Sequence, residues 1–239
     1  TIRDSDGLDV AAWHADLDPD AALIILAHGN RSDRRSLIGR AAMLTRAGYA
    51  VLLLDLRAHG ESPGAHRSFG YGEARSIVAA IGYVRSRWPS RKVGLIGISL
   101  GGASAIVAAR QARADAYVLE AVYSDLRTAA QNRFAKRLGE LGRVVADLVL
   151  LQVPWRLGFY LDELSMTARI PEIKAPVLMI AGDRDRRTTV DDTRALFAAA
   201  EEPKTLWMIP GARHEDFHAR QPREYERSVL SFFRTSLGQ

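Results

Sequence analysis

The sequence predicts an α/β fold in which helices cover both faces of a mainly parallel, doubly wound sheet. Short apolar runs alternate with longer segments of helical periodicity along the 239 residues, and this alternation is typical of parallel sheets. Several of the apolar runs end in loops rich in glycine and polar residues, where open parallel sheets place their functional groups. Residues 123–173 are far too many for a simple crossover loop, which predicts an insertion there.

Four apolar runs have the length and the density of apolar side chains expected of buried strands. Each run is followed by a glycine, a proline or polar residues that end it. We expect strands at residues 92–96, 116–122, 176–181 and 205–209.

Segments with helical periodicity lie between and after these runs. Residues 35–47 are expected to form the first crossover helix, because Gly48 can adopt the left-handed conformation that ends a helix. Residues 71–88 are expected to form the second, because Pro89 disfavours a helical residue before it. Further helices are expected at residues 102–107, 188–200 and 223–237.

The composition fits a single domain over residues 1–239 with an insertion at about 123–173. With 47% hydrophobic residues the chain can bury one sizeable core but is short for two. No stretch approaches the roughly 20 apolar residues that a membrane helix needs, and the richest, residues 148–153, is interrupted by Pro154. We expect a chain that is soluble as given, with the cytoplasm favoured; Thr1 leaves an upstream signal or anchor open.

The charged residues and the cysteine count narrow the classes of partner and chemistry. The chain has no cysteine, which excludes disulfides, thiol catalysis and cysteine-ligated metal. The net charge is +5, but the arginines are interleaved with acids and no basic run of five occurs. We therefore expect solvated ion pairs and no nucleic-acid partner. The oligomeric state is open.

The most informative motif is Gly-Ile-Ser-Leu-Gly at residues 97–101, directly after an expected strand. A serine between two glycines, at a sharp turn from a strand into a helix, is typical of a nucleophile elbow. Gly97 and Gly101 are needed because the serine backbone is strained and a Cβ two residues away would clash across the turn. The turn exposes the Ser99 hydroxyl and points the Leu100 amide toward any negative charge that develops beside it.

A serine nucleophile needs a base, and the base needs an acid that orients it. His214 comes directly after the last expected strand, whereas His218 lies inside the polar start of the next helix. We favour His214, because the base must reach the serine hydroxyl within about 3 Å. Two other serines, Ser104 and Ser124, lack a glycine-flanked turn after a strand. The four histidines that precede the elbow are expected in loops or in structural roles.

Asp185 follows another expected strand, and the order Ser99, Asp185, His214 resembles that of the α/β-hydrolase superfamily. Within that resemblance, the family pattern of a glycine, two residues and an aspartate selects Asp185 after Gly182. Asp183 shares the loop, and its alternative role is that of a turn former that pairs with a nearby arginine. Glu120 ends an earlier strand from which some relatives draw their acid, so it remains a further alternative.

The resemblance extends over nearly the whole chain. Residues 23–30 look like the family's strand and oxyanion-hole loop, in which His28 would act as a brace. Residues 51–62 look like its next strand and loop, and residues 6–13 are similar to the short hairpin that opens bacterial members. Ala58 departs from the family, where glycine is common at this position, and this departure concerns loop geometry alone.

Two further features of the site are implied by the resemblance to bacterial serine esterases. The backbone N–H of Asn30 would join that of Leu100 in the oxyanion hole. A helical cap would cover the active site at about 123–173. Helical spacing explains most of its apolar residues as packing, and as a group they predict an apolar pocket roof that includes Trp155 and Phe159.

We therefore expect cleavage of carboxylic esters through an acyl-enzyme on Ser99, with a small-molecule acyl ester as the substrate. Peptidase or acyltransferase activity on the same triad is one alternative, and a non-catalytic binding protein that keeps the fold is another. The chemistry needs no metal and no organic cofactor. A serine nucleophile argues against epoxide hydrolase and dehalogenase chemistry, which use an aspartate.

Overall fold

The computed structural model describes residues 1–16, 18 and 20–238. Within this part of the chain the central sheet has seven strands in the order β3-β5-β4-β6-β7-β8-β9. β3 pairs antiparallel with β5, and the other pairs are parallel, which confirms the predicted fold class. The strands are β3 (Ala12–Ala15), β4 (Leu23–Ala27), β5 (Ala50–Leu54), β6 (Val93–Ile98), β7 (Ala116–Glu120), β8 (Val177–Gly182) and β9 (Lys204–Ile209).

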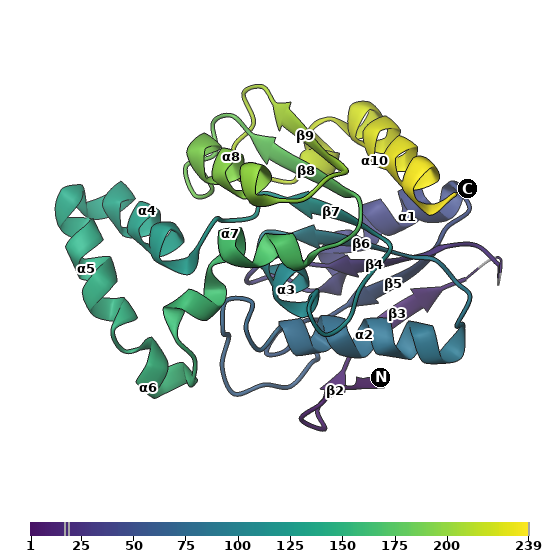
Figure 1. Cartoon of the computed structure of the whole chain (residues 1–239), viewed down its shortest axis with the longest axis horizontal. Helices are drawn as coiled ribbons and strands as arrows, with labels where there is room; N and C mark the ends of the chain where they lie inside the picture. The colour runs from purple at the N-terminus through teal and green to yellow at the C-terminus, as the bar shows by residue number, and fades with distance from the viewer. Residues whose placement is uncertain (17, 19, 239) are drawn as a thin grey trace.

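Helices cover both faces of the sheet because its buried strands present apolar side chains in both directions. In β4, for example, Leu23 and Ile25 point into one core, whereas Ile24 and Leu26 point into the other. The first core contains residues of α2 (Ala74–Arg87), α3 (Leu100–Ala108) and α8 (Val190–Ala199). The second contains residues of α1 (Ile38–Arg46) and α10 (Pro222–Leu237), which lie across the sheet from α2 (Figure 1).

The ends of the expected helices shift by a few residues. The first crossover opens with a 3-10 helix, η1 (Arg34–Leu37), before α1 begins, and Gly48 follows α1 with a φ of 88°. A short helix that was not expected, α9 (Phe217–Arg220), precedes α10. At the N-terminus β1 (Ile2–Arg3) and β2 (Asp9–Val10) form a separate antiparallel hairpin.

The strand order switches at β4: the next strand in the chain, β5, lies on one side of it, and β6 lies on the other. Ala27 at the end of β4 is paired with Gly97 in β6. The loop after β4 and the turn after β6 therefore leave the sheet side by side. Such a switch point is where open α/β sheets bind ligands.

The long segment between β7 and β8, residues 121–176, is helical, and we call it the insertion. Asp125 caps its first helix by accepting a hydrogen bond from the Thr128 N–H at 2.7 Å. Asp125 also forms an isolated antiparallel bridge with Ser165, so the chain leaves and returns through a narrow neck. The insertion contains α4 (Leu126–Leu138), α5 (Glu140–Leu150), α6 (Val153–Leu157), η2 (Leu161–Leu164), α7 (Met166–Arg169) and η3 (Ile170–Glu172).

In Figure 1 α4, α5 and α6 extend to the left, beyond the layers that cover the sheet. The expectation that most apolar residues of this segment pack inside the protein is wrong for its outer side, because no described element covers that side. The exposed large apolar residues of the insertion are Leu138, Leu141, Val144, Leu148, Val149, Leu151, Trp155 and Tyr160. Among the described residues, no helix is both long and apolar enough to cross a membrane.

Candidate active site

Ser99 is the single residue between the end of β6 and the start of α3. Its φ of 50° and ψ of −107° lie in a region that L-residues rarely adopt. The Ser99 N–H donates to the carbonyl oxygen of Glu120 at 2.7 Å, which ties the turn to the neighbouring strand β7. The surrounding structure thus holds the strained backbone in place.

The glycines on either side of Ser99 are required by close backbone contacts. A Cβ on Gly97 would lie 2.6 Å from the Cα of Gly102, across the turn. A Cβ on Gly101 would overlap the carbonyl group of Ala27 at the end of β4. Only glycine permits α3 to begin this close to the sheet.

The loop after β4 lies directly beside the serine. A Cβ on Gly29 would be 3.8 Å from the Cβ of Ser99. His28 is fully buried; it accepts a hydrogen bond from the Leu56 N–H on Nε2 at 3.1 Å, and its Nδ1 lies 2.7 Å from the Gly29 carbonyl oxygen. Since Nε2 accepts, Nδ1 carries the proton and donates. Burial lowers the pKa of His28, which keeps this neutral tautomer in place.

His214 and Asp185 meet at the ends of two neighbouring strands. Asp185 follows β8 and His214 follows β9, and the His214 Nδ1 lies 2.7 Å from the Asp185 Oδ2. The same carboxylate accepts hydrogen bonds from the Thr188 hydroxyl at 2.6 Å and from the Arg187 N–H at 2.7 Å. Burial acts to raise the pKa of Asp185, but the hydrogen bond and charge of His214, together with the other donors, hold it below its usual value.

The competing acids are engaged elsewhere. Asp183 accepts the Gly211 N–H at 2.6 Å and so fastens the loop after β9 to the loop after β8. Glu120 is buried, and its carboxylate is bound by the Arg40 guanidinium at 2.8 Å and 3.1 Å and by the Tyr225 hydroxyl. Of the three candidates, Asp185 is therefore the one hydrogen-bonded to His214.

The competing base and nucleophiles also have other partners. The His218 Nε2 lies 3.4 Å from Glu226 Oε1, at the side of α10. The Ser104 hydroxyl is buried and donates to the Leu100 carbonyl oxygen at 2.7 Å, and the Ser124 hydroxyl donates to Asp192 Oδ1 at the same distance. These contacts are those of structural side chains.

One cavity of about 950 Å³ brings the candidate residues together. Its lining includes Ser99, Leu100, Asn30 and His214, together with residues of α4, α5 and α6. No hydrogen bond of the described residues joins Ser99 to His214, and such contacts commonly tighten only when substrate binds. The wall from the insertion is formed by Leu126, Ala129, Ala130, Arg133, Phe134, Val149, Leu150, Gln152, Val153, Arg156 and Leu157.

The two side chains expected in the pocket lie elsewhere. Trp155 is 91% exposed and does not line the cavity, although its neighbours Val153 and Arg156 do. Phe159 is buried, but it stacks on Tyr71 with ring centroids 4.7 Å apart instead of lining the cavity. The expectation of an apolar roof therefore rests on other residues of the same helices.

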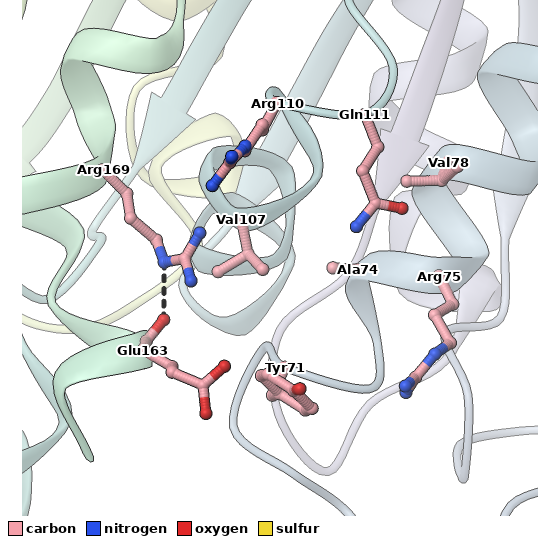
Figure 2. Close-up of a pocket in the computed structure, with 9 residues that line it drawn as sticks. All are labelled: Tyr71, Ala74, Arg75, Val78, Val107, Arg110, Gln111, Glu163 and Arg169. Atoms are coloured by element: carbon pink, nitrogen blue, oxygen red, sulfur yellow. Dashed lines mark hydrogen bonds between the residues drawn. The ribbon is translucent and has the colours of Figure 1, made fainter. Parts of the chain in front are cut away.

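A second cavity, of about 400 Å³, lies between α2, α3 and the η2–α7 segment. Figure 2 shows that Arg75, Arg110 and Arg169 extend toward it and that Arg169 donates to the Glu163 carbonyl oxygen at 2.6 Å. Neither the candidate nucleophile nor the candidate base lines this cavity. Within the described residues no group of His, Cys, Asp and Glu side chains could hold a metal ion.

Several side chains that shape the site were not singled out from the sequence. Thr188, three residues after Asp185, donates to the carboxylate that orients His214. An Asp followed three residues later by Thr is a local hydrogen-bonding pattern, so this partner had a readable signal. Arg40 was missed because its partner Glu120 is 80 residues away in the chain.

Comparisons with known proteins agree with this architecture. The profile described as "Alpha/beta hydrolase family" matches residues 24–227. The uncharacterized protein Rv2307c of Mycobacterium tuberculosis is 29% identical over 220 residues, which are 90% of this chain and 71% of that protein. The uncharacterized protein YqkD of Bacillus subtilis is 26% identical over 235 residues, which are 95% of this chain and 75% of that protein.

The fold is also found among solved structures. The Pyrococcus furiosus esterase Pf2001 superposes with a TM-score of 0.79 at 22% identity, covering 99% of this chain and 90% of that one. Its likeness concerns the fold, whereas the family profile covers most of this chain's residues. The chain belongs to the α/β-hydrolase family.

Proposed function

We propose that this protein is a serine hydrolase that cleaves carboxylic esters through an acyl-enzyme on Ser99. The observation that carries the proposal is the hydrogen-bonded pair of His214 and Asp185, with His214 opening into the same cavity as the strained Ser99. A strained serine, an oriented histidine and a buried carboxylate in one site are the parts that nucleophilic acyl transfer requires.

In the first half of the reaction His214 Nε2 takes the proton of the Ser99 hydroxyl as the serine oxygen bonds to the acyl carbon. The carbonyl oxygen becomes negative, and the backbone N–H groups of Asn30 and Leu100 stabilise it. Leu100 is the first residue of α3, so the helix dipole adds to its amide. The tetrahedral intermediate then collapses, the ester C–O bond breaks, and His214 gives its proton to the departing alcohol.

In the second half, His214 takes a proton from water as the water oxygen bonds to the acyl carbon. The bond between the acyl carbon and the Ser99 oxygen then breaks, His214 returns its proton to that oxygen, and the acid is released. Asp185 keeps its charge throughout, which its lowered pKa favours. It fixes the His214 tautomer that leaves Nε2 free to accept a proton, and it stabilises the imidazolium that forms twice per turnover.

The cavity favours an ester with an apolar acyl group. Its volume of about 950 Å³ is at the upper end for small-molecule sites, and α4 to α6 contribute mainly apolar side chains to it. The solved structure of similar fold from Pyrococcus furiosus is described as an esterase, which agrees with this choice. We propose that the insertion serves as the cap of the site and that Phe134 and Leu157, which line the cavity, contact the acyl chain.

A fluorophosphonate probe, which bonds to activated serines, tests the proposal. We expect the wild-type chain to be labelled on Ser99 and to hydrolyse p-nitrophenyl esters, and the Ser99→Ala variant to lose both properties. Ser104→Ala is the matched control, because Ser104 lies one helical turn further along α3 with its hydroxyl bound to a carbonyl; it should keep both. Label on another serine, or an unlabelled wild type, would contradict the proposal.

A further inference from the structure

The outer side of α5 carries an apolar stripe that faces solvent. Leu141, Val144, Leu148 and Leu151 follow one another at intervals of three, four and three residues, which places them on one helix face. Each is between 56% and 67% exposed. We call these four residues the outer stripe. Trp155, one helix further on in α6, is the most exposed large apolar side chain described, at 91%.

The opposite face of α5 packs against α4. Gly142, Ala146 and Leu150 are buried there, and a Cβ on Gly142 would lie 2.5 Å from the backbone of Phe134 in α4. The close packing of α4 on α5 accounts for this face alone. The side chains of the outer stripe belong to neither apolar core, and contiguous exposed apolar surface of this kind marks an interaction site.

The charges around the outer stripe indicate what binds there. Residues 126–157 contain six Lys or Arg and two Asp or Glu. The two acids pair with Arg127 at 3.5 Å and with Arg143 at 3.2 Å. No ion pair among the described residues engages the other four, all of which are exposed. Arg133 and Arg156 line the cavity, whereas Lys136 and Arg137, in the last turn of α4, do not. Lys136 and Arg137 therefore place positive charge without an ion-pair partner a few residues before Leu141, the start of the outer stripe.

This combination distinguishes between two occupants. A second copy of the chain would bring two basic surfaces together, and their repulsion opposes association. An anionic lipid surface would attract the basic side chains while its acyl region accepts the stripe, as it does for amphipathic helices with basic polar faces. A tryptophan at the tip fits the same boundary, because its ring is amphipathic.

We propose that the outer stripe and Trp155 dock the protein on the surface of an anionic lipid bilayer. The inner side of the same helices lines the cavity that contains Ser99, through Val149, Leu150 and Val153. Docking would place this cavity about one helix diameter, some 10 Å, from the lipid. The functional meaning of this position rests on the proposed function. An acyl ester that leaves the bilayer could then reach Ser99 by a short path.

Vesicle co-sedimentation tests the docking. It is carried out on the full chain with Ser99→Ala, so that the result does not depend on whether Ser99 is the nucleophile. We expect binding to phosphatidylglycerol vesicles, much weaker binding to phosphatidylcholine vesicles, and a loss of binding as salt is raised. The Trp155 emission should shift to the blue on binding, and Trp155→Phe should remove that shift while most binding remains.

Surface variants separate the contribution of the apolar stripe to lipid binding from that of the basic side chains. The Leu141→Ser/Leu148→Ser variant should lower the partition coefficient by at least about tenfold, and Lys136→Gln/Arg137→Gln should remove most of the preference for anionic lipid. None of these four residues lines the cavity, so hydrolysis of a water-soluble ester in the Ser99 background should stay unchanged. Ile38→Ser, which changes an exposed apolar residue on α1, is the matched control and should bind like its parent.

Three results would overturn the inference. The first is no binding of the parent chain to phosphatidylglycerol vesicles. The second is equal binding by the stripe variant and the Ile38→Ser control. The third is a dimer in light scattering that the stripe variant abolishes, together with no vesicle binding, which would assign this face to a second copy of the chain.

Discussion

Two histidines four residues apart show how much the position of a single side chain decides at this site. His214 follows β9 and hydrogen-bonds Asp185, whereas His218 lies in α9, next to Glu226 and the ring of Tyr225. Both are imidazoles with a carboxylate neighbour. Only His214 shares a cavity with Ser99, so chemistry at the serine is expected of His214 alone.

We expect His214→Ala to lower kcat/KM for a p-nitrophenyl ester by about a thousandfold or more, because the members of a catalytic triad act as a unit. His218→Ala is the matched control and should change kcat/KM by only a few fold. Steady-state kinetics on both variants, with circular dichroism to confirm that each is folded, measures the contrast. Similar losses in the two variants would contradict the assignment of the base.

At the scale of an element, helices α4 to α6 line the cavity, but with other residues than the two that the sequence led us to expect. Helical periodicity in a sequence shows that one face is apolar, but it does not show what covers that face. Trp155 and the outer stripe carry the same pattern as a buried helix, yet they face solvent. Phe134 and Leu157 line the cavity, and nothing in their local sequence distinguishes them from the exposed residues.

The selectivity for acyl chains should depend on the cavity wall. We expect Phe134→Ala and Leu157→Ala each to shift the ratio of kcat/KM between octanoate and acetate esters by roughly 1–3 kcal/mol, the scale on which apolar pockets discriminate. Trp155→Ala should leave the ratio unchanged because its side chain is outside the cavity. A shift for Trp155→Ala with none for Phe134→Ala would place the acyl chain elsewhere.

The loop after β4 should make the stability of the protein pH-dependent through His28. Its pKa is lowered by burial from the ordinary 6.5, so below about pH 6.5 the unfolded chain binds a proton that the folded chain resists. The contribution of His28 to the free energy of unfolding is therefore fully present above about pH 6.5. This contribution falls as the pH drops below that value. Burial also lowers the pKa of His14, so the comparison is made in a His14→Gln background.

In that background we expect His28→Gln to be less stable than its parent at pH 8, because the variant disrupts the bond to the Leu56 N–H, with a difference that narrows toward pH 5. Urea denaturation at several pH values provides the measurement. A difference that stays constant with pH would show that His28 does not carry the effect.

Sequence patterns were most informative where function depends on neighbours in the chain. The elbow around Ser99, the strand ends before Asp185 and His214, and the glycine contacts at the turn all arise within a few residues. Contacts between distant segments gave no such signal. Glu120 bonds Arg40 and Tyr225, which lie 80 and 105 residues away, and a single sequence does not reveal such pairs.

At the scale of the whole molecule, this buried group joins the sheet to two helices that cover one of its faces. Arg40 comes from α1, Glu120 from β7 and Tyr225 from α10. Burial raises the pKa of Tyr225, which keeps its hydroxyl protonated as a donor to Glu120. Arg40 also pairs with Asp216 at 2.9 Å, in the loop that follows His214. The network thus connects the core to the loop that carries the candidate base.

We expect Glu120→Gln to lower the free energy of unfolding by about 3 kcal/mol, the lower end for a broken buried pair, because Asp216 still pairs with Arg40. Tyr225→Phe, the control, should cost about 1 kcal/mol, the size of one hydrogen bond. Urea unfolding gives both values. If Glu120→Gln instead keeps its stability and loses ester hydrolysis, Glu120 rather than Asp185 is the acid of the site.

The bridge between Asp125 and Ser165 has a consequence for how such a protein can change. Because residues 126–164 leave and return through one backbone pair, we expect changes in their length to leave the register of β7 and β8 unaltered, provided that the residues which pack in the first core are kept. Chimeras joined at this neck should inherit the chemistry of one parent and the substrate range of the other. The insertion and the rest of the chain could then evolve as two separate modules.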